Sequence, residues 1–210
     1  MIRRHALLLG AAAVLAPVLP VLAQGRTLTP EEQQLIAEIN AHNSAIRTMA
    51  GRFLQIDTNG GRTEGTFFLE RPDKVAFRYA PPSREEIVSQ GRGFYVLNRR
   101  DETYYAYPQD SIPLRQFLGE DINLLNANVV DVTTSDGYIS ITVMDETVAG
   151  TVQVSLVFDV DTKELAQWSL VEPSGAEMTF SLYDVQKGME IPRAFFSIPA
   201  TYRGLDPSTR

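Results

Sequence analysis

Few residues of this 210-residue chain are of types that act as nucleophiles, general bases or soft metal ligands. The chain has no cysteine, and its two histidines are His5 and His42. A serine hydrolase would have to use His42, because His5 lies in an N-terminal leader, and the sequence has no G-x-S-x-G motif. We expect His42 to be a solvated histidine on the polar side of a helix. The sequence therefore predicts a binding protein that is not an enzyme.

Cation and phosphate sites have equally weak support in the sequence. The turn at 57–61 resembles the start of a calcium loop, but Phe68 stands where the bidentate glutamate would fall. The acidic residues at 159–161 also lie in a predicted turn. The C-x-x-C and H-E-x-x-H spacings of zinc sites are absent, and no glycine-rich loop opens a helix. We therefore expect no metal and no cofactor.

The first 23 residues have the pattern of a signal peptide. Arg3 and Arg4 precede an apolar run over 6–22, and Val21-Leu22-Ala23 fits a signal-peptidase cleavage site. We expect residues 1–23 to be removed and residues 24–210 to form a single domain, exported by either the general or the twin-arginine route. Without the two leader arginines, 17 Lys and Arg face 26 Asp and Glu, a formal charge of −9. This charge disfavours binding to nucleic acid or anionic lipid.

Alternating apolar and polar residues over 65–82 predict a β-hairpin with one apolar face. Its turn has two possible lengths. A two-residue turn at Pro72-Asp73 mixes polar with apolar residues, whereas a three-residue turn over 72–74 sets Phe67 and Leu69 beside Tyr79 and Phe77. We prefer the longer turn because it separates the two kinds of side chain. In that register Arg71 lies at the rim of the apolar face.

The remaining pattern indicates two helical segments among many strands. A helix is expected over 30–47, starting with the cap Thr29-Pro30, and one or two short helices are expected over 112–125. Further strands are expected from Met49 to the turn at 59–61, and over 86–89, 93–98, 103–107, 129–134, 138–145, 151–159, 164–172, 176–184 and 194–198. About ten strands are too many for a small flat sheet without curling. The prediction is a mainly β fold: a half-open, highly curved antiparallel β-barrel covered by an N-terminal helix and a short inserted helical lid.

Several segments resemble the outer-membrane lipoprotein carrier family of Gram-negative bacteria. They are G-R-F-L-Q at 51–55, G-T-F-F-L-E-R-P at 65–72, F-R-Y-x-x-P at 77–82 and I-V-S-x-G at 87–91, with I-P-L at 112–114 and F-F-S-I-P at 195–199. The resemblance implies a periplasmic carrier with an apolar cavity for the acyl chains of lipoproteins. Such a carrier receives acylated lipoproteins from an inner-membrane ABC transporter and delivers them to an outer-membrane acceptor or to the membrane itself. The family's gating arginine, which ties the barrel to its lid, falls on Arg71.

The expected site is thus an apolar cavity with a gate. Its lining would be Phe53, Phe67, Leu69, Val75, Phe77 and Tyr79 from the sheet, with Leu114 and Leu118 from the lid. Arg71 at the rim could donate hydrogen bonds to lid carbonyls without needing a carboxylate. We expect a monomer. The alternative is a structural or sensory β-module whose solid core leaves no cavity and which binds a partner protein in the cell envelope.

Overall fold

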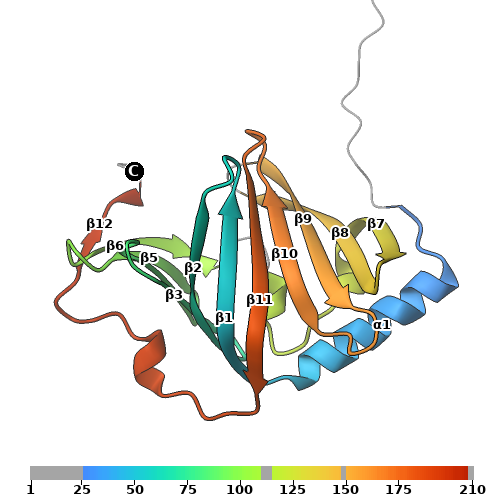
Figure 1. Ribbon diagram of the computed structural model, residues 1–210, viewed down its shortest axis with the longest axis horizontal. Coiled ribbons are helices and arrows are strands. Elements are labelled where there is room, and N and C mark those ends of the chain that lie inside the picture. The colour runs from blue at the N-terminus through green and yellow to red at the C-terminus, as the bar shows by residue number, and fades with distance from the viewer. Residues whose placement is uncertain (1–25, 110–114, 148–149, 208–210) are drawn as a thin grey trace, which may run out of the picture.

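The computed structural model describes residues 26–109, 115–147 and 150–207, which form one open, strongly curved sheet with a helix on its inner side (Figure 1). The strand order is β12-β6-β5-β4-β3-β2-β1-β11-β10-β9-β8-β7. Every neighbouring pair is antiparallel except β12 with β6. The predicted fold is confirmed, and the described residues form twelve strands where the sequence suggested about ten. The strands are β1 Thr48–Asp57, β2 Arg62–Glu70, β3 Lys74–Tyr79, β4 Glu85–Gln90, β5 Gly93–Asn98, β6 Thr103–Pro108, β7 Asn128–Ser135, β8 Tyr138–Thr147, β9 Gly150–Asp159, β10 Leu165–Val171, β11 Glu177–Lys187 and β12 Arg203–Leu205.

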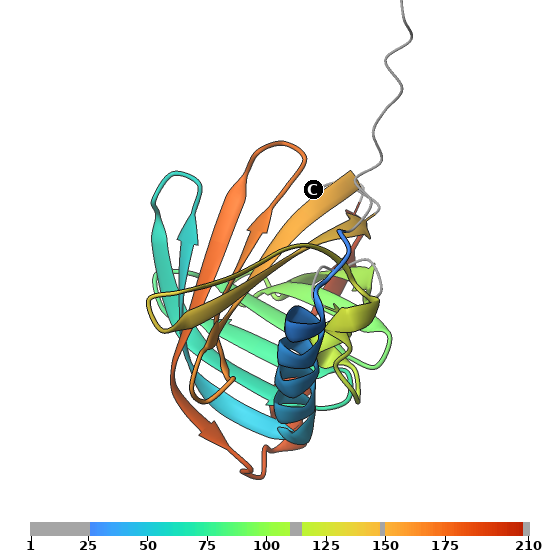
Figure 2. The same cartoon turned by 90° about the vertical axis from the view of Figure 1, so that its right-hand side faces the viewer.

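The long helix α1, Pro30–Ala45, stands across the open side of the sheet (Figure 2). It begins with a capping box, in which the Thr29 side chain accepts a hydrogen bond from the Glu32 backbone and the Glu32 side chain accepts one from the Thr29 backbone. Ile36 and Ile39 of α1 are fully buried against β7–β10. Within the three described ranges, no helix combines the length and the apolar character needed to cross a membrane.

In the described residues that follow β6, two short helical pieces form the lid, defined here as residues 115–126. The α-helix α2 covers Arg115–Leu118, and the 3-10 helix η2 covers Leu124–Asn126. This agrees with the one or two short helices predicted over 112–125, although residues 112–114, including Leu114, lie outside the described part of the chain.

The C-terminal segment lies against the convex side of the sheet. The prediction of a strand over 194–198 is wrong, because this region is the 3-10 helix η3, Arg193–Phe196, between Pro192 and Pro199. The Phe195 ring stacks on Phe68 of β2 at 4.5 Å between centroids, and Phe196 is buried in a cluster on the same side. The aromatic pair therefore covers the back of β3–β5 instead of pairing as a strand.

The register of the central hairpin also differs from the predicted one. Leu69 pairs with Val75, and Phe67 pairs with Phe77, so the loop consists of residues 71–73 and not 72–74. The pairing moved by two residues, which preserves the predicted segregation of apolar and polar faces. The physical reason is that Arg71 belongs to the turn, where its backbone N–H donates to the Arg47 carbonyl at 2.8 Å.

Gly65 lets β3 and the Phe53 ring approach β2 closely. A Cβ atom there would lie 2.1 Å from the Arg78 carbonyl oxygen and 2.7 Å from the Phe53 ring. We predict that Gly65→Ala lowers the free energy of unfolding by about 3 kcal/mol, measured by urea denaturation. Gly204→Ala is the matched control, since its Cβ would meet the Tyr104 hydroxyl no closer than 3.1 Å. Equal losses in both variants would contradict this account of the close approach.

Candidate functional site

A cluster of aromatic side chains covers the concave face of β1, β2, β3 and β11. Phe53, Phe67, Tyr79 and Phe180 are buried there, and Phe77 is half-buried among them. The Phe53 ring meets Phe77 edge-on at 5.3 Å and Tyr79 at 5.0 Å. The structure thus brings together the sheet residues that the sequence assigned to the cavity. In this conformation their rings contact one another.

Tyr79 carries the polar atom of this floor. Its hydroxyl donates to the Gln55 side-chain oxygen at 2.6 Å. Burial raises the pKa of Tyr79 well above its ordinary value, with a smaller contribution from the negative charge of Glu85. The phenol therefore stays neutral, and the floor presents no charge to an apolar ligand.

Leu118 at the end of α2 joins the lid to the β2–β3 hairpin. It forms a buried cluster with Leu69 and Val75, and Met49 and Phe77 pack around them. On the other side of the lid, Phe117 stacks on Phe158 of β9 at 6.2 Å between ring centroids. The lid therefore bridges the two halves of the curved sheet.

An ion pair fixes the start of α2 to β8. The Arg115 guanidinium donates two hydrogen bonds to the Asp145 carboxylate, at 2.6 and 2.9 Å. This bidentate geometry sets orientation as well as distance.

Three successive lid carbonyls accept hydrogen bonds from outside the lid. The Leu118 carbonyl accepts from the Asp73 backbone N–H at 2.7 Å, and the Gly119 carbonyl accepts from Arg71 Nη1 at 3.4 Å. The Glu120 carbonyl accepts from Arg47 Nη1 at 2.9 Å. The connection between α2 and η2 is thereby held through its backbone, which does not require any particular lid side chain.

Helix α1 supplies two further bonds to the same connection. The Ile122 N–H donates to Ser44 Oγ at 2.8 Å, and the Leu124 N–H donates to the Asn40 side-chain oxygen at 3.1 Å. Asn40 is buried, so this bond satisfies a polar group that water does not reach easily.

Arg71 lies where α1, the lid and the β2–β3 turn meet. Its Nε donates to the Ile46 carbonyl at the end of α1 at 3.1 Å, in addition to the bond to Gly119. Only 8% of Arg71 is exposed. Burial, together with the positive charge of Arg47, lowers the pKa of Arg71 to about 10, so the guanidinium is still charged at neutral pH. Arg71 thus donates to backbone carbonyls and not to a carboxylate, which is the kind of contact that the sequence analysis anticipated. Its function as a gate stays a prediction.

The turn beside Arg71 is held by residues that the sequence analysis did not single out. Asp73 has a backbone φ of 67°, and its carbonyl accepts from Gln109 Nε2 at 3.0 Å. The same Gln109 nitrogen donates to the fully buried Ser89 hydroxyl at 2.6 Å. The signal available in the sequence was that Ser89 follows the apolar pair Ile87-Val88 in a predicted strand, since a hydroxyl buried there requires a partner.

An apolar row also continues past the predicted cavity residues. Strand register places Phe67, Phe77, Ile87, Val96 and Tyr105 side by side across β2 to β6. The last three are half-buried, and the sequence analysis recognised their strands without assigning them to the site. The row extends the apolar floor toward β6.

We expected His42 to be solvated, but the structure differs from this expectation. Its Nε2 atom is buried, with no hydrogen-bond partner in the described part of the chain, and lies 3.8 Å from the Glu164 carboxylate. Glu164 also pairs with Lys187. Across residues 26–109, 115–147 and 150–207, no group of three or more His, Cys, Asp or Glu side chains is arranged to hold a metal ion.

Comparison with known proteins identifies the family. The sequence profile of the family described as outer membrane lipoprotein carrier protein LolA matches residues 44–199. The chain belongs to the LolA family. A curated relative, the outer-membrane lipoprotein carrier protein of Alkalilimnicola ehrlichii, is 32% identical over 87 residues, which cover 39% of this chain and 37% of the relative. The match thus spans well under two thirds of that relative.

Solved structures share the fold. A conserved protein from Thermus thermophilus aligns with a TM-score of 0.50 and 6% identity, over 83% of this chain and 98% of that one. A DUF1329 family protein from Desulfovibrio piger aligns with a TM-score of 0.51 and 8% identity, over 78% of this chain and 95% of that one. At such low identity these likenesses concern the fold alone.

The contacts of Arg71 lead to a prediction about the LolA-type lid. Replacing Arg71 with leucine leaves the Ile46 and Gly119 carbonyls without their donor, and lid opening lets water satisfy them. Amide hydrogen exchange at Asp73, whose N–H donates to the Leu118 carbonyl, should accelerate about tenfold or more, equivalent to ~1.4 kcal/mol. Arg78→Leu is the control, because Arg78 pairs with Glu86 and packs over Phe195 on the convex side. Unchanged exchange in Arg71→Leu would show that Arg71 does not hold the lid.

Proposed function

We propose that this LolA-family protein carries lipoproteins through the periplasm by shielding their acyl chains against the concave face of its sheet. The observation that carries the proposal is a buried apolar floor beneath a lid that is held largely through its backbone. The floor consists of the predicted residues Phe53, Phe67, Leu69, Val75, Phe77 and Tyr79, extended by Ile87, Val96 and Tyr105. No chemical transformation is part of this function.

The closed arrangement supports a cycle of opening and closure. The aromatic rings contact each other, so an acyl chain enters only when the lid and some of these rings move apart. Leu118 is the lid residue that contacts the β2–β3 hairpin most directly, and Arg71 ties the same corner to α1. Opening at this corner uncovers the floor while Phe117 and Leu124 stay packed on β8 and β9.

Free energies explain why a carrier benefits from such a lid. Burial gains about 0.8 kcal/mol per CH₂, or roughly 12 kcal/mol for a sixteen-carbon chain. Three chains would gain roughly 35 kcal/mol, well above the ~20 kcal/mol at which non-covalent affinities saturate. A carrier that kept all of this gain could not release its cargo. The cost of breaking lid contacts, at roughly 1 kcal/mol net for each hydrogen bond, lowers the affinity and permits delivery.

The proposed cycle has defined partners and a location. The carrier is exported with removal of residues 1–23, and residues 24–210 act as one domain. It accepts acylated lipoproteins from an inner-membrane ABC transporter and transfers them to an outer-membrane acceptor or to the membrane. The formal charge of −9 disfavours adhesion to anionic lipid during transit.

Acyl-chain binding is tested with an environment-sensitive apolar dye. The purified domain should bind the dye, and a triacylated lipopeptide should displace it, whereas the same peptide without acyl chains should not. Arg71→Leu should change loading or release, and delivery of lipoprotein to outer-membrane vesicles measures both. Equal displacement by acylated and non-acylated peptide would refute the proposal.

A disulfide lock tests whether opening at Leu118 admits the ligand. The chain has no cysteine, so Val75→Cys with Leu118→Cys introduces its only thiols, at positions whose native side chains belong to one buried cluster. Oxidation should abolish lipopeptide binding, and dithiothreitol should restore it, because the bond holds the lid on the hairpin. Each single cysteine variant serves as a control and should bind in both conditions. Full binding by the oxidised double variant would place the entrance elsewhere.

The second candidate is a structural or sensory module that binds a partner protein. The close contacts of Phe53 with Phe77, Tyr79 and Phe180 favour it, because these rings fill the concave face as a solid core would. The same dye experiment separates the two functions. If the protein is a carrier, dye binding should increase as the lid opens. If it is a solid module, neither the native protein nor the Arg71→Leu variant should bind the dye.

A further inference from the structure

Strand β7 is the last strand of the described sheet, and one of its two edges has no neighbouring strand there. The beginning of that edge is covered, where the Arg26 N–H donates to the Val129 carbonyl at 3.2 Å. From Val130 to Ser135 the side chains are mostly exposed. An edge strand of this kind offers a row of backbone donors and acceptors to another chain.

The hairpin register identifies which backbone groups point outward. Residues 136 and 137 form a two-residue turn, with φ of 52° and 81°, and Ser135 pairs with Tyr138. The pair that flanks such a turn is hydrogen-bonded, and hydrogen-bonded pairs alternate with non-bonded ones. Val132 and Thr134 therefore direct their N–H and C=O groups away from β8. No described residue outside the sheet bonds to them.

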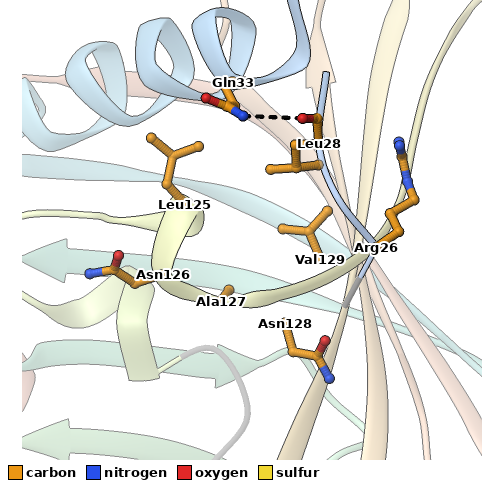
Figure 3. Close-up of a pocket in the computed structure, with 8 residues that line it drawn as sticks. All are labelled: Arg26, Leu28, Gln33, Leu125, Asn126, Ala127, Asn128 and Val129. Atoms are coloured by element: carbon orange, nitrogen blue, oxygen red, sulfur yellow. Dashed lines mark hydrogen bonds between the residues drawn. The ribbon is translucent and has the colours of Figure 1, made fainter. Parts of the chain in front are cut away.

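A cleft of about 550 Å³ opens at the covered end of this edge (Figure 3). Leu125 of η2 faces Leu28 and Val129 across it, and the wall is completed by Arg26, Gln33, Asn126, Ala127 and Asn128. Leu125 is 40% exposed, one of the most exposed large apolar side chains in the described part of the chain. The cleft can receive one bulky apolar side chain from a strand that runs along β7.

Charge restricts what can bind this edge. Residues 128–171, which contain β7–β10, carry seven acidic residues and one basic residue, Lys163. Asp131 and Asp136 lie on β7 and its turn and are exposed, and Asp159 lies close by, because it pairs with Tyr138 at the start of β8. Two copies of this edge would repel each other, because pairing would bring two acidic halves together. A cationic segment gains from the same charges.

We infer that β7 binds an extended, basic peptide segment of a partner protein as an added antiparallel strand. Because an antiparallel strand ends where β7 begins, a bulky apolar residue at the carboxyl end of the segment enters the cleft beside Leu125. The recognition combines backbone bonds to Val132 and Thr134, charge attraction by Asp131 and Asp136, and one apolar anchor. This surface lies apart from the Arg71 corner, so it operates whether or not acyl chains are bound.

The test uses the domain 24–210 and the capped peptide Lys-Thr-Val-Lys-Val-Thr-Leu. Fluorescence anisotropy should show saturable binding, and amide exchange at Val132 and Thr134 should slow about tenfold or more on saturation. A peptide N-methylated at alternate amides, chosen to remove the bonds to β7, should not bind. Failure of the peptide to protect these two amides, or equal binding of the N-methylated peptide, would overturn the inference.

Protein variants separate the charge contribution from the apolar one. Asp131→Lys with Asp136→Lys should weaken binding about tenfold at ~50 mM salt and less at higher salt, whereas the control Glu177→Lys should change it less than about twofold. Leu125→Ser should weaken binding of the peptide that ends in leucine. Binding of the analogue that ends in serine should stay unchanged. If all variants bound alike, the edge would be excluded as the binding site. Lipopeptide displacement of the dye is measured separately, so either proposal can fail alone.

Discussion

The hydrogen bonds that fix the lid backbone constrain the rest of this structure. Between Leu118 and Leu124, five backbone groups have partners on the β2–β3 turn, on α1 or on Arg47 just after α1. In water the same groups would be solvated at little net cost, so each bond contributes only about 1 kcal/mol. Apolar contacts alone would make the lid a permanent part of the core. Backbone bonds define a single closed position and still leave it reversible.

Arg71 illustrates how burial limits that closure. Taking a guanidinium out of water is unfavourable, and the lowered pKa of about 10 expresses that cost. Two carbonyls offset part of it, whereas a carboxylate would have offset far more and would have left an unpaired charge on opening. An arginine between carbonyls therefore suits a joint that must break, because both sides regain water when they part.

Local patterns predicted most of the fold and about half of the residues that meet at the candidate site. The alternation in β1–β3 identified Phe53, Phe67, Val75 and Tyr79 as one face, and Thr29-Pro30 located the start of α1, because these features depend on near neighbours. The exact register and the 3-10 helix at 193–196 depend on contacts far along the chain, with Arg47 and Phe68. Likewise, Ser44, Asn40 and Gln109 have ordinary local surroundings. Only the folded chain brings Ser44 and Asn40 to the lid and Gln109 to the β2–β3 turn.

The lid side chains belong to two separate buried clusters, and the boundary between these clusters suggests how opening proceeds. Phe117, Ile122 and Leu124 of the lid pack with α1 against β7–β10, whereas Leu118 is the one described lid side chain that packs with Leu69 and Val75. Parting at Leu118 therefore exposes few lid side chains, and α1 with most of the lid stays on the β7–β10 half. Arg71 of the β2–β3 turn spans the boundary between the two clusters, because it bonds to the end of α1 and to Gly119 of the lid. Because the far edge at β7 belongs to the half that retains α1, a partner bound there would hold that half while the β1–β3 half moves.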